Sequence, residues 1–260
     1  MSSRLPRAVV SLCVRLDATP SLLEQETKQA VESLGVKLLE TLSSRQIPAT
    51  WAVEDPATSS VVKRVAASLC GQEVALAASA ASLTGGVWEI REFEKRVTTV
   101  RGLGLPLSTV TVDRELEDLE YESLARLGIT AASRPGTAAT RFARRRTQAP
   151  TPRYGCWCFA VSASLPGASR WGVGGGGYRT AKREIDLAVR DHGLVQLSVD
   201  VSALITRGHS AERVLARVVD LIERRRGLGQ VDIATLGKTA ARLSGQCTGK
   251  PSRSILRPAA

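Results

Sequence analysis

Apolar and polar residues follow two alternating patterns along the chain, one typical of buried strands and one typical of amphipathic helices. Residues 8–14 are almost continuously apolar, as strands of parallel sheets usually are. Thr19 and Pro20 then form a helix-start signal, and apolar residues recur at three- and four-residue spacing up to about residue 43. The same change of pattern is repeated along the chain, so strands and helices are expected to alternate.

The repeated pattern indicates the fold class. Strands are predicted at residues 8–14, 49–53, 73–78, 108–112, 129–132, 156–162 and 194–199, and helices at 19–43, 56–69, 87–103, 115–127, 178–192 and 210–227. Seven strands that alternate with helices indicate an α/β fold on a parallel sheet, either open or closed into a barrel. No linker divides the pattern, so we expect a single domain over residues 1–245 and a flexible C-terminal tail over 246–260.

Composition agrees with a globular chain. Hydrophobic residues make up 43% of the sequence, and no apolar run approaches the roughly 18 residues of a membrane span. The five cysteines are odd in number and scattered, and no signal-peptide pattern is present, so we expect reduced thiols in a cytoplasmic protein. The two histidines, His192 and His209, lie in separate stretches, which excludes any mechanism that needs a histidine cluster.

The positive charge is concentrated in one segment. The formal net charge is +11, and residues 123–183 contain eleven arginines and lysines but no aspartate or glutamate. Four of these cations, Arg141, Arg144, Arg145 and Arg146, crowd into one predicted loop. Such a segment suggests an anionic partner, either a nucleic acid or an acidic protein. A solvated arginine-rich surface is the alternative.

Three stretches resemble a known family. Residues 10–20, 46–53 (Gln-Ile-Pro-Ala-Thr-Trp-Ala-Val) and 70–75 (Cys-Gly-Gln-Glu-Val-Ala) are similar to polysaccharide deacetylases of the NodB-homology type, carbohydrate esterase family 4. The resemblance implies a distorted seven-stranded (β/α) barrel with its active site at the C-terminal ends of the strands. It also implies a chemistry in which one aspartate acts as a base, while a second aspartate and two histidines hold a divalent metal.

The family's metal ligands are absent from the matching positions. Asp17 matches the catalytic base, but Ala18, Ala77 and Ala81 stand where the resemblance places the three ligands. The histidine expected near the last strand is replaced by Ser198. The resemblance therefore implies a pseudoenzyme without a cofactor, which binds a carbohydrate or an anionic ligand and does not catalyse. Arg134 and the four loop arginines are its candidate binding residues.

Two other functions fit the sequence. In the first, a repurposed carbohydrate-active hydrolase uses carboxylates that follow strand ends, namely Glu54, Asp55, Asp113, Asp17 and Asp200. Asp55 and Asp113 are explained as helix caps, which leaves Asp17 and Asp200 as the candidate catalytic residues. In the second, the chain binds a nucleic acid or an acidic protein through the basic segment 123–183.

Overall fold

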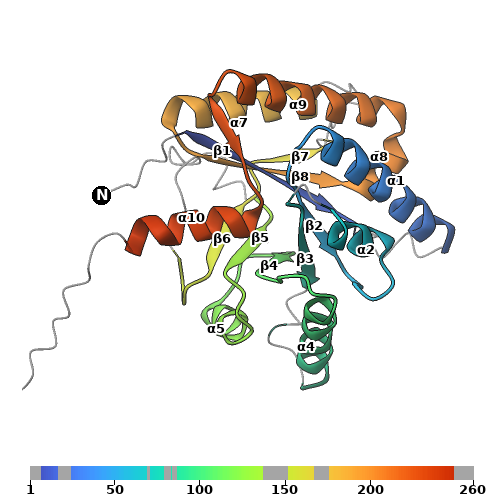
Figure 1. The fold of residues 1–260 in the computed structure, drawn as a ribbon, viewed down its shortest axis with the longest axis vertical. Helices are drawn as coiled ribbons and strands as arrows, with labels where there is room; N and C mark the ends of the chain where they lie inside the picture. Colours follow the sequence, from blue (N-terminus) through green and yellow to red (C-terminus); the bar gives the residue numbers. More distant parts are fainter. Residues whose placement is uncertain are drawn as a thin grey trace, which may run out of the picture.

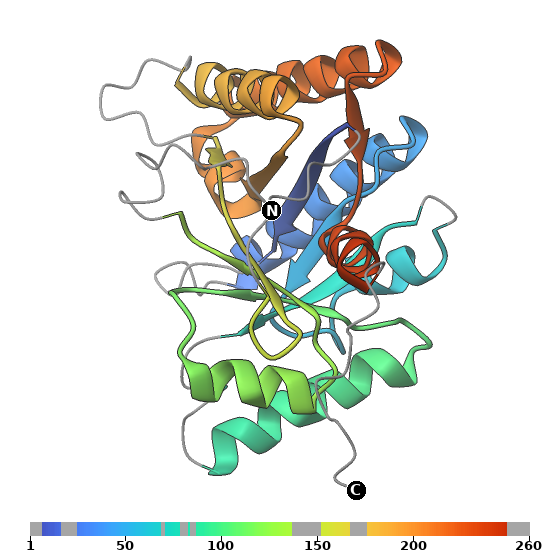
Figure 2. The same ribbon diagram turned by 90° about the vertical axis from the view of Figure 1, so that its left-hand side faces the viewer.

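Nine parallel strands form one curled sheet at the centre of the structure, and helices cover its outside (Figures 1 and 2). The computed structural model describes residues 7–16, 25–68, 71–78, 83, 87–136, 152–166 and 176–248. The strands are β1 (Ala8–Arg15), β2 (Thr50–Val53), β3 (Glu73–Ala78), β4 (Thr109–Val112), β5 (Ala131–Arg134), β6 (Trp157–Ala160), β7 (Ala163–Leu165), β8 (Leu194–Asp200) and β9 (Val231–Ile233). Their order across the sheet is β6-β5-β4-β3-β2-β1-β8-β7, and β9 pairs with β1.

Most helices lie where the sequence pattern predicts them, but none was predicted at residues 201–207 or 236–248. They are α1 (Gln25–Ser44), α2 (Ser60–Ala66), α4 (Val87–Gly102), α5 (Asp118–Arg126), α7 (Gly176–Asp191), α8 (Val201–Arg207), α9 (His209–Gly227) and α10 (Leu236–Thr248). Among the described residues, no helix has both the length and the apolar character needed to cross a membrane.

One bent strand joins the two edges of the curled sheet. β6 and β7 lie at opposite ends of the strand order, yet only Val161 and Ser162 separate them in the chain. The Val161 amide donates to the carbonyl of Arg134 on β5 at 2.9 Å, and the Ser162 amide donates to the carbonyl of Gln196 on β8 at 2.8 Å. If β6 and β7 are counted as one strand, the strand order across the sheet contains the seven strands that the sequence predicts. β9 is an extra strand that pairs with the first half of β1.

Alternation along each strand separates an inner from an outer apolar cluster. The outer cluster packs the strands against helices and includes Val10, Leu12 and Val14 of β1. The inner cluster fills the end of the barrel where the strands begin, and α10 contributes Leu236, Ala240 and Leu243 to it. The C-terminal helix therefore packs against the inside of the sheet rather than around it.

A carboxylate ties α10 to the strands. Glu73, at the start of β3, accepts hydrogen bonds from the hydroxyls of Thr50, Ser108 and Thr109 and from the amide of Gly237. A side chain at Gly237 would collide with Glu73 and Ser108, so only glycine allows this approach. The tie fixes the first turn of α10 at the end of the barrel where the strands begin.

Three expected helix starts are wrong, because other residues make the caps. Ser59, not Asp55, caps α2, while Asp55 bonds the Ala57 amide and the Thr58 hydroxyl within a turn. Asp113 does not cap α5, since Glu117 forms a capping box there with the glutamate three residues later. Ser210 does not cap α9, which begins at His209 after the short helix α8.

The C-terminal end of the structure also differs from the expectation. α10 continues to Thr248, past the expected start of the tail at residue 246. The rest of the expected tail, residues 249–260, lies outside the described residues.

Candidate functional site

The strands all run in one direction, so their C-terminal ends meet at one end of the barrel, here called the mouth. Strand register aligns Arg15 with Asp200 across β1 and β8, and aligns Ala77 with Thr111 and Thr111 with Ser133 across β3, β4 and β5. Successive side chains of a strand point to opposite faces of the sheet, and Val14 lies on the outer face. Arg15 and the other residues in these registers therefore lie on the inner face. Among the described residues, the mouth is therefore lined by the hydroxyl groups of Thr111 and Ser133 together with the guanidinium of Arg15 and the carboxylate of Asp200.

A buried polar group, here called the lumen cluster, consists of Thr111, Ser133 and Gln196. The side-chain amide of Gln196 on β8 donates to the Ser133 hydroxyl on β5, so the bond joins strands far apart in the sheet order. All three side chains are at most 6% exposed. Thr111 Oγ1 and Gln196 Oε1 have no hydrogen-bond partner among the described residues. An unpaired buried polar atom costs about 1–3 kcal/mol, so a bound hydroxyl or water would stabilise this cluster.

Sequence reasoning missed the lumen cluster. Its signal is a polar residue at an inward position of an otherwise apolar strand, such as Gln196 within β8. The strand order that brings the three residues together is set by the whole fold, and local patterns do not reveal it.

Asp200 has a structural role that the sequence analysis did not foresee. Its Oδ1 atom accepts hydrogen bonds from the Ala203 amide at 3.0 Å and from the Ser202 hydroxyl at 2.7 Å, which caps α8. The sequence analysis, which treated Asp200 as a carboxylate without a capping role, is therefore wrong on this point. The other predicted catalytic residue, Asp17, lies outside the described residues.

The residues at the positions where the sequence resemblance places the metal ligands do not fit a divalent metal. Ala77 lies on the inner face of β3 beside Thr111, and its methyl group has no lone pair to donate. Ala18 and Ala81 lie outside the described residues, but they are also alanines. Within the described ranges, no group of three or more His, Cys, Asp or Glu side chains is placed to hold a metal ion. We therefore derive no reaction step through a metal.

Carboxylates from outside the basic segment neutralise several of its cations. Arg126 pairs with Glu122 at 2.6 Å, Arg153 with Asp118 at 3.3 Å and Lys182 with Asp186 at 2.6 Å. Arg134, a predicted binding residue, lies 3.5 Å from Glu115, with its side chain only 14% exposed. Its side chain lies beside Cys158 of β6 and Tyr121 of α5, on the outer face of the sheet and not inside the barrel. The other predicted binding residues, Arg141, Arg144, Arg145 and Arg146, lie outside the described residues.

A hollow of about 590 Å³ opens beside the mouth, between α1 and α2. Two of its carboxylates have structural partners. Glu32 accepts hydrogen bonds from the backbone amide and the hydroxyl of Ser60 at the start of α2, and Asp55 holds the turn before that helix. These two carboxylates of the hollow therefore serve the fold.

Comparison with solved structures identifies the fold. A Mycobacterium smegmatis protein assigned to the polysaccharide deacetylases superposes with a TM-score of 0.70 at 15% identity, covering 100% of this chain and 98% of that one. The 4-α-glucanotransferase of Thermococcus litoralis gives 0.65 at 10% identity, and the match covers 91% of this chain but 40% of that enzyme. No family model matches the sequence, and no curated protein matches it. The polysaccharide deacetylase type of (β/α) barrel expected from the sequence is thus confirmed as the fold.

Proposed function

We propose that this chain is a polysaccharide deacetylase-like protein that binds a carbohydrate at the mouth of its barrel and does not deacetylate it. The observation that carries the proposal is the lumen cluster. Two buried atoms with hydrogen-bonding capacity, Thr111 Oγ1 and Gln196 Oε1, lack partners among the described residues. A sugar hydroxyl both donates and accepts, so one hydroxyl could donate to Gln196 and accept from Thr111.

The surroundings of the lumen cluster suit a polyhydroxylated or anionic ligand. Ser164 and Ser198 are register partners on β7 and β8 at the mouth, and Ser164 is exposed. Arg15 lies opposite Asp200 in the register between β1 and β8. Arg141, Arg144, Arg145 and Arg146 remain proposed contacts for an anionic group of the ligand, whereas Arg134 is less favoured because it lies on the outer face of β5 beside Glu115.

The proposed lack of catalysis rests on the donor groups at the matching positions. The three alanines cannot hold the metal that supplies electrostatic stabilisation in the family, which is usually the largest contribution to such catalysis. Ser198 stands where the resemblance places a histidine acid. The alternative, a hydrolase that uses Asp17 and Asp200, is less favoured because Asp200 is engaged in capping α8.

Calorimetric titration with an N-acetylglucosamine tetramer tests the proposal. Thr111→Val removes a hydroxyl that has no partner among the described residues, so the folded state should be unchanged. Loss of one ligand hydrogen bond should weaken binding by about 2- to 12-fold, equivalent to about 0.5–1.5 kcal/mol.

The matched control is Thr109→Val, two residues earlier on the same face of β4. The Thr109 hydroxyl donates to Glu73 at 2.5 Å, so this variant should lose about 1–3 kcal/mol of stability yet bind the sugar like the wild type. Equal affinity of Thr111→Val and the wild type, or no binding heat with the wild type, would overturn the proposal.

A further inference from the structure

Helices α7 and α9 lie side by side on the outside of the sheet (Figures 1 and 2). The Arg217 guanidinium of α9 lies 4.2 Å from the centre of the Tyr178 ring on α7, and Arg225 pairs with Asp186 at 2.5 Å. Tyr178 precedes Asp186 by eight positions on α7, and their partners Arg217 and Arg225 follow in the same order and spacing on α9. The two helices therefore run in the same direction. They present a common outer surface to solvent.

This surface carries two rows of cations and is here called the ridge. The rows are Arg179, Lys182, Arg183 and Arg190 on α7, and Arg213, Arg217, Arg224 and Arg225 on α9. The rows extend over twelve residues of α7 and thirteen of α9, which is about 16–18 Å of α-helix. The α7 row lines a shallow groove of about 390 Å³.

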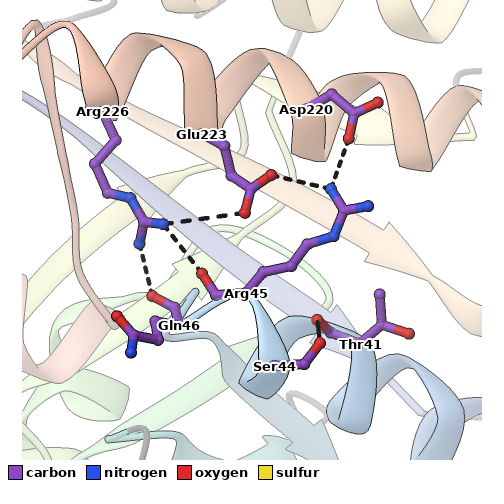
Figure 3. A network of polar contacts seen from close by, with 7 residues as sticks. All are labelled: Thr41, Ser44, Arg45, Gln46, Asp220, Glu223 and Arg226. Atoms are coloured by element: carbon purple, nitrogen blue, oxygen red, sulfur yellow. Dashed lines mark hydrogen bonds and ion pairs between the residues drawn. The ribbon is translucent and has the colours of Figure 1, made fainter.

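The ridge retains uncompensated positive charge. Its acid Asp186 is already paired twice, with Lys182 at 2.6 Å and with Arg225 at 2.5 Å. Two further carboxylates of α9, Asp220 and Glu223, are paired with Arg45 of the neighbouring segment at 2.6 and 3.0 Å, and Figure 3 shows both contacts.

Five arginines of the ridge therefore stay without a carboxylate partner among the described residues. They are Arg179, Arg183, Arg213, Arg217 and Arg224, and all five are exposed. Two of them belong to α7 and three to α9, so the uncompensated charge forms two parallel rows.

We propose that the ridge binds double-helical nucleic acid through its phosphates, without reading the base sequence. Packed helices lie about 8–10 Å apart, and the grooves of a duplex separate two phosphate rows by about 6–12 Å, so two rows of cations can meet two rows of anions. Guanidinium groups also match phosphate with paired hydrogen bonds.

The ridge favours a duplex over a single strand. Single-strand binding relies on exposed aromatic rings that stack on bases. Tyr178 is the aromatic residue of the described part of these two helices, and Arg217 already covers its ring. The ridge therefore offers phosphate contacts without a stacking platform.

Fluorescence anisotropy with a labelled DNA duplex of about two helical turns tests the proposal. Five phosphate contacts predict a slope of log K against log salt of about −4.5, which is a loss of about 500-fold between about 50 and 200 mM salt. The variant R179S/R183S/R217S/R224S should reduce this slope by about 3.6, to about −0.9. The variant R179S/R183S keeps the stacking of Arg217 on Tyr178 and should reduce the slope by about 1.8.

A matched variant separates the ridge from overall charge. K28S/K37S/K63S/R91S removes four exposed cations from α1, α2 and α4, and it should keep the wild-type slope. Equal weakening by the ridge and control variants would overturn the proposal, as would the absence of duplex binding at the lowest salt. Binding of heparin but not of the duplex would also overturn it and would indicate a sulfated glycan.

Discussion

At the scale of single residues, a group of buried ionisable side chains stays neutral beneath α5. Burial raises the pKa of the Cys156 thiol from its ordinary value of 9.0 to about 12, and the neighbouring Cys158 adds to the shift. Burial likewise raises the pKa of Cys158 and of Tyr121 above their ordinary values. A thiol with a raised pKa is a poor nucleophile, so these cysteines serve packing.

The raised pKa of Cys156 makes stability depend on alkaline pH. Between pH 9 and about 12, the folded state keeps a proton on Cys156 that the unfolded state has released. The free energy of unfolding should therefore fall as pH rises through this window, with this group contributing up to about 1.4 kcal/mol per pH unit. Urea unfolding at several pH values should give a shallower decline for Cys156→Ala than for the wild type. Parallel curves for the two proteins would contradict the assignment.

At the scale of secondary-structure elements, the sequence predicts the elements of the repeating strand and helix pattern, and it misses α8, β9 and α10. Glu73–Ala78 was predicted with the bounds that β3 has, and α4 ends within one residue of its expected end. The seven-residue helix α8 was missed because it begins directly after β8 without a loop to mark it. Helix starts were misplaced where several nearby polar side chains compete to cap the same turn, as before α2.

Variants of Asp200 test whether the carboxylate at the end of β8 stabilises the fold or takes part in catalysis. Asp200→Ala should remove the cap of α8 and lower the free energy of unfolding by about 0.5–2 kcal/mol. Serine is also a good cap, so Asp200→Ser should recover most of this stability. Equal destabilisation of the two variants in thermal unfolding would show that the negative charge, and not the cap, is what α8 requires.

At the scale of the whole molecule, the bent strand β6–β7 and the tie between Glu73 and α10 fix the barrel around its lumen. Alternating patterns and the family resemblance were enough to predict this architecture. They could not predict the lumen cluster, because Thr111, Ser133 and Gln196 come from three strands whose positions depend on the complete sheet order. The same holds for the ridge, whose two rows lie on helices α7 and α9, with β8 and α8 between them in the chain.

One NMR sample separates binding from turnover. Protein, an N-acetylglucosamine tetramer and Zn²⁺ are kept together, and saturation transfer to the sugar protons is recorded along with the methyl signal of free acetate. We predict saturation transfer to the sugar and no acetate above a protein-free blank, because alanines occupy the positions where the sequence resemblance places the metal ligands. Acetate that accumulates with the wild type but not with Asp17→Asn would contradict this and show a working deacetylase.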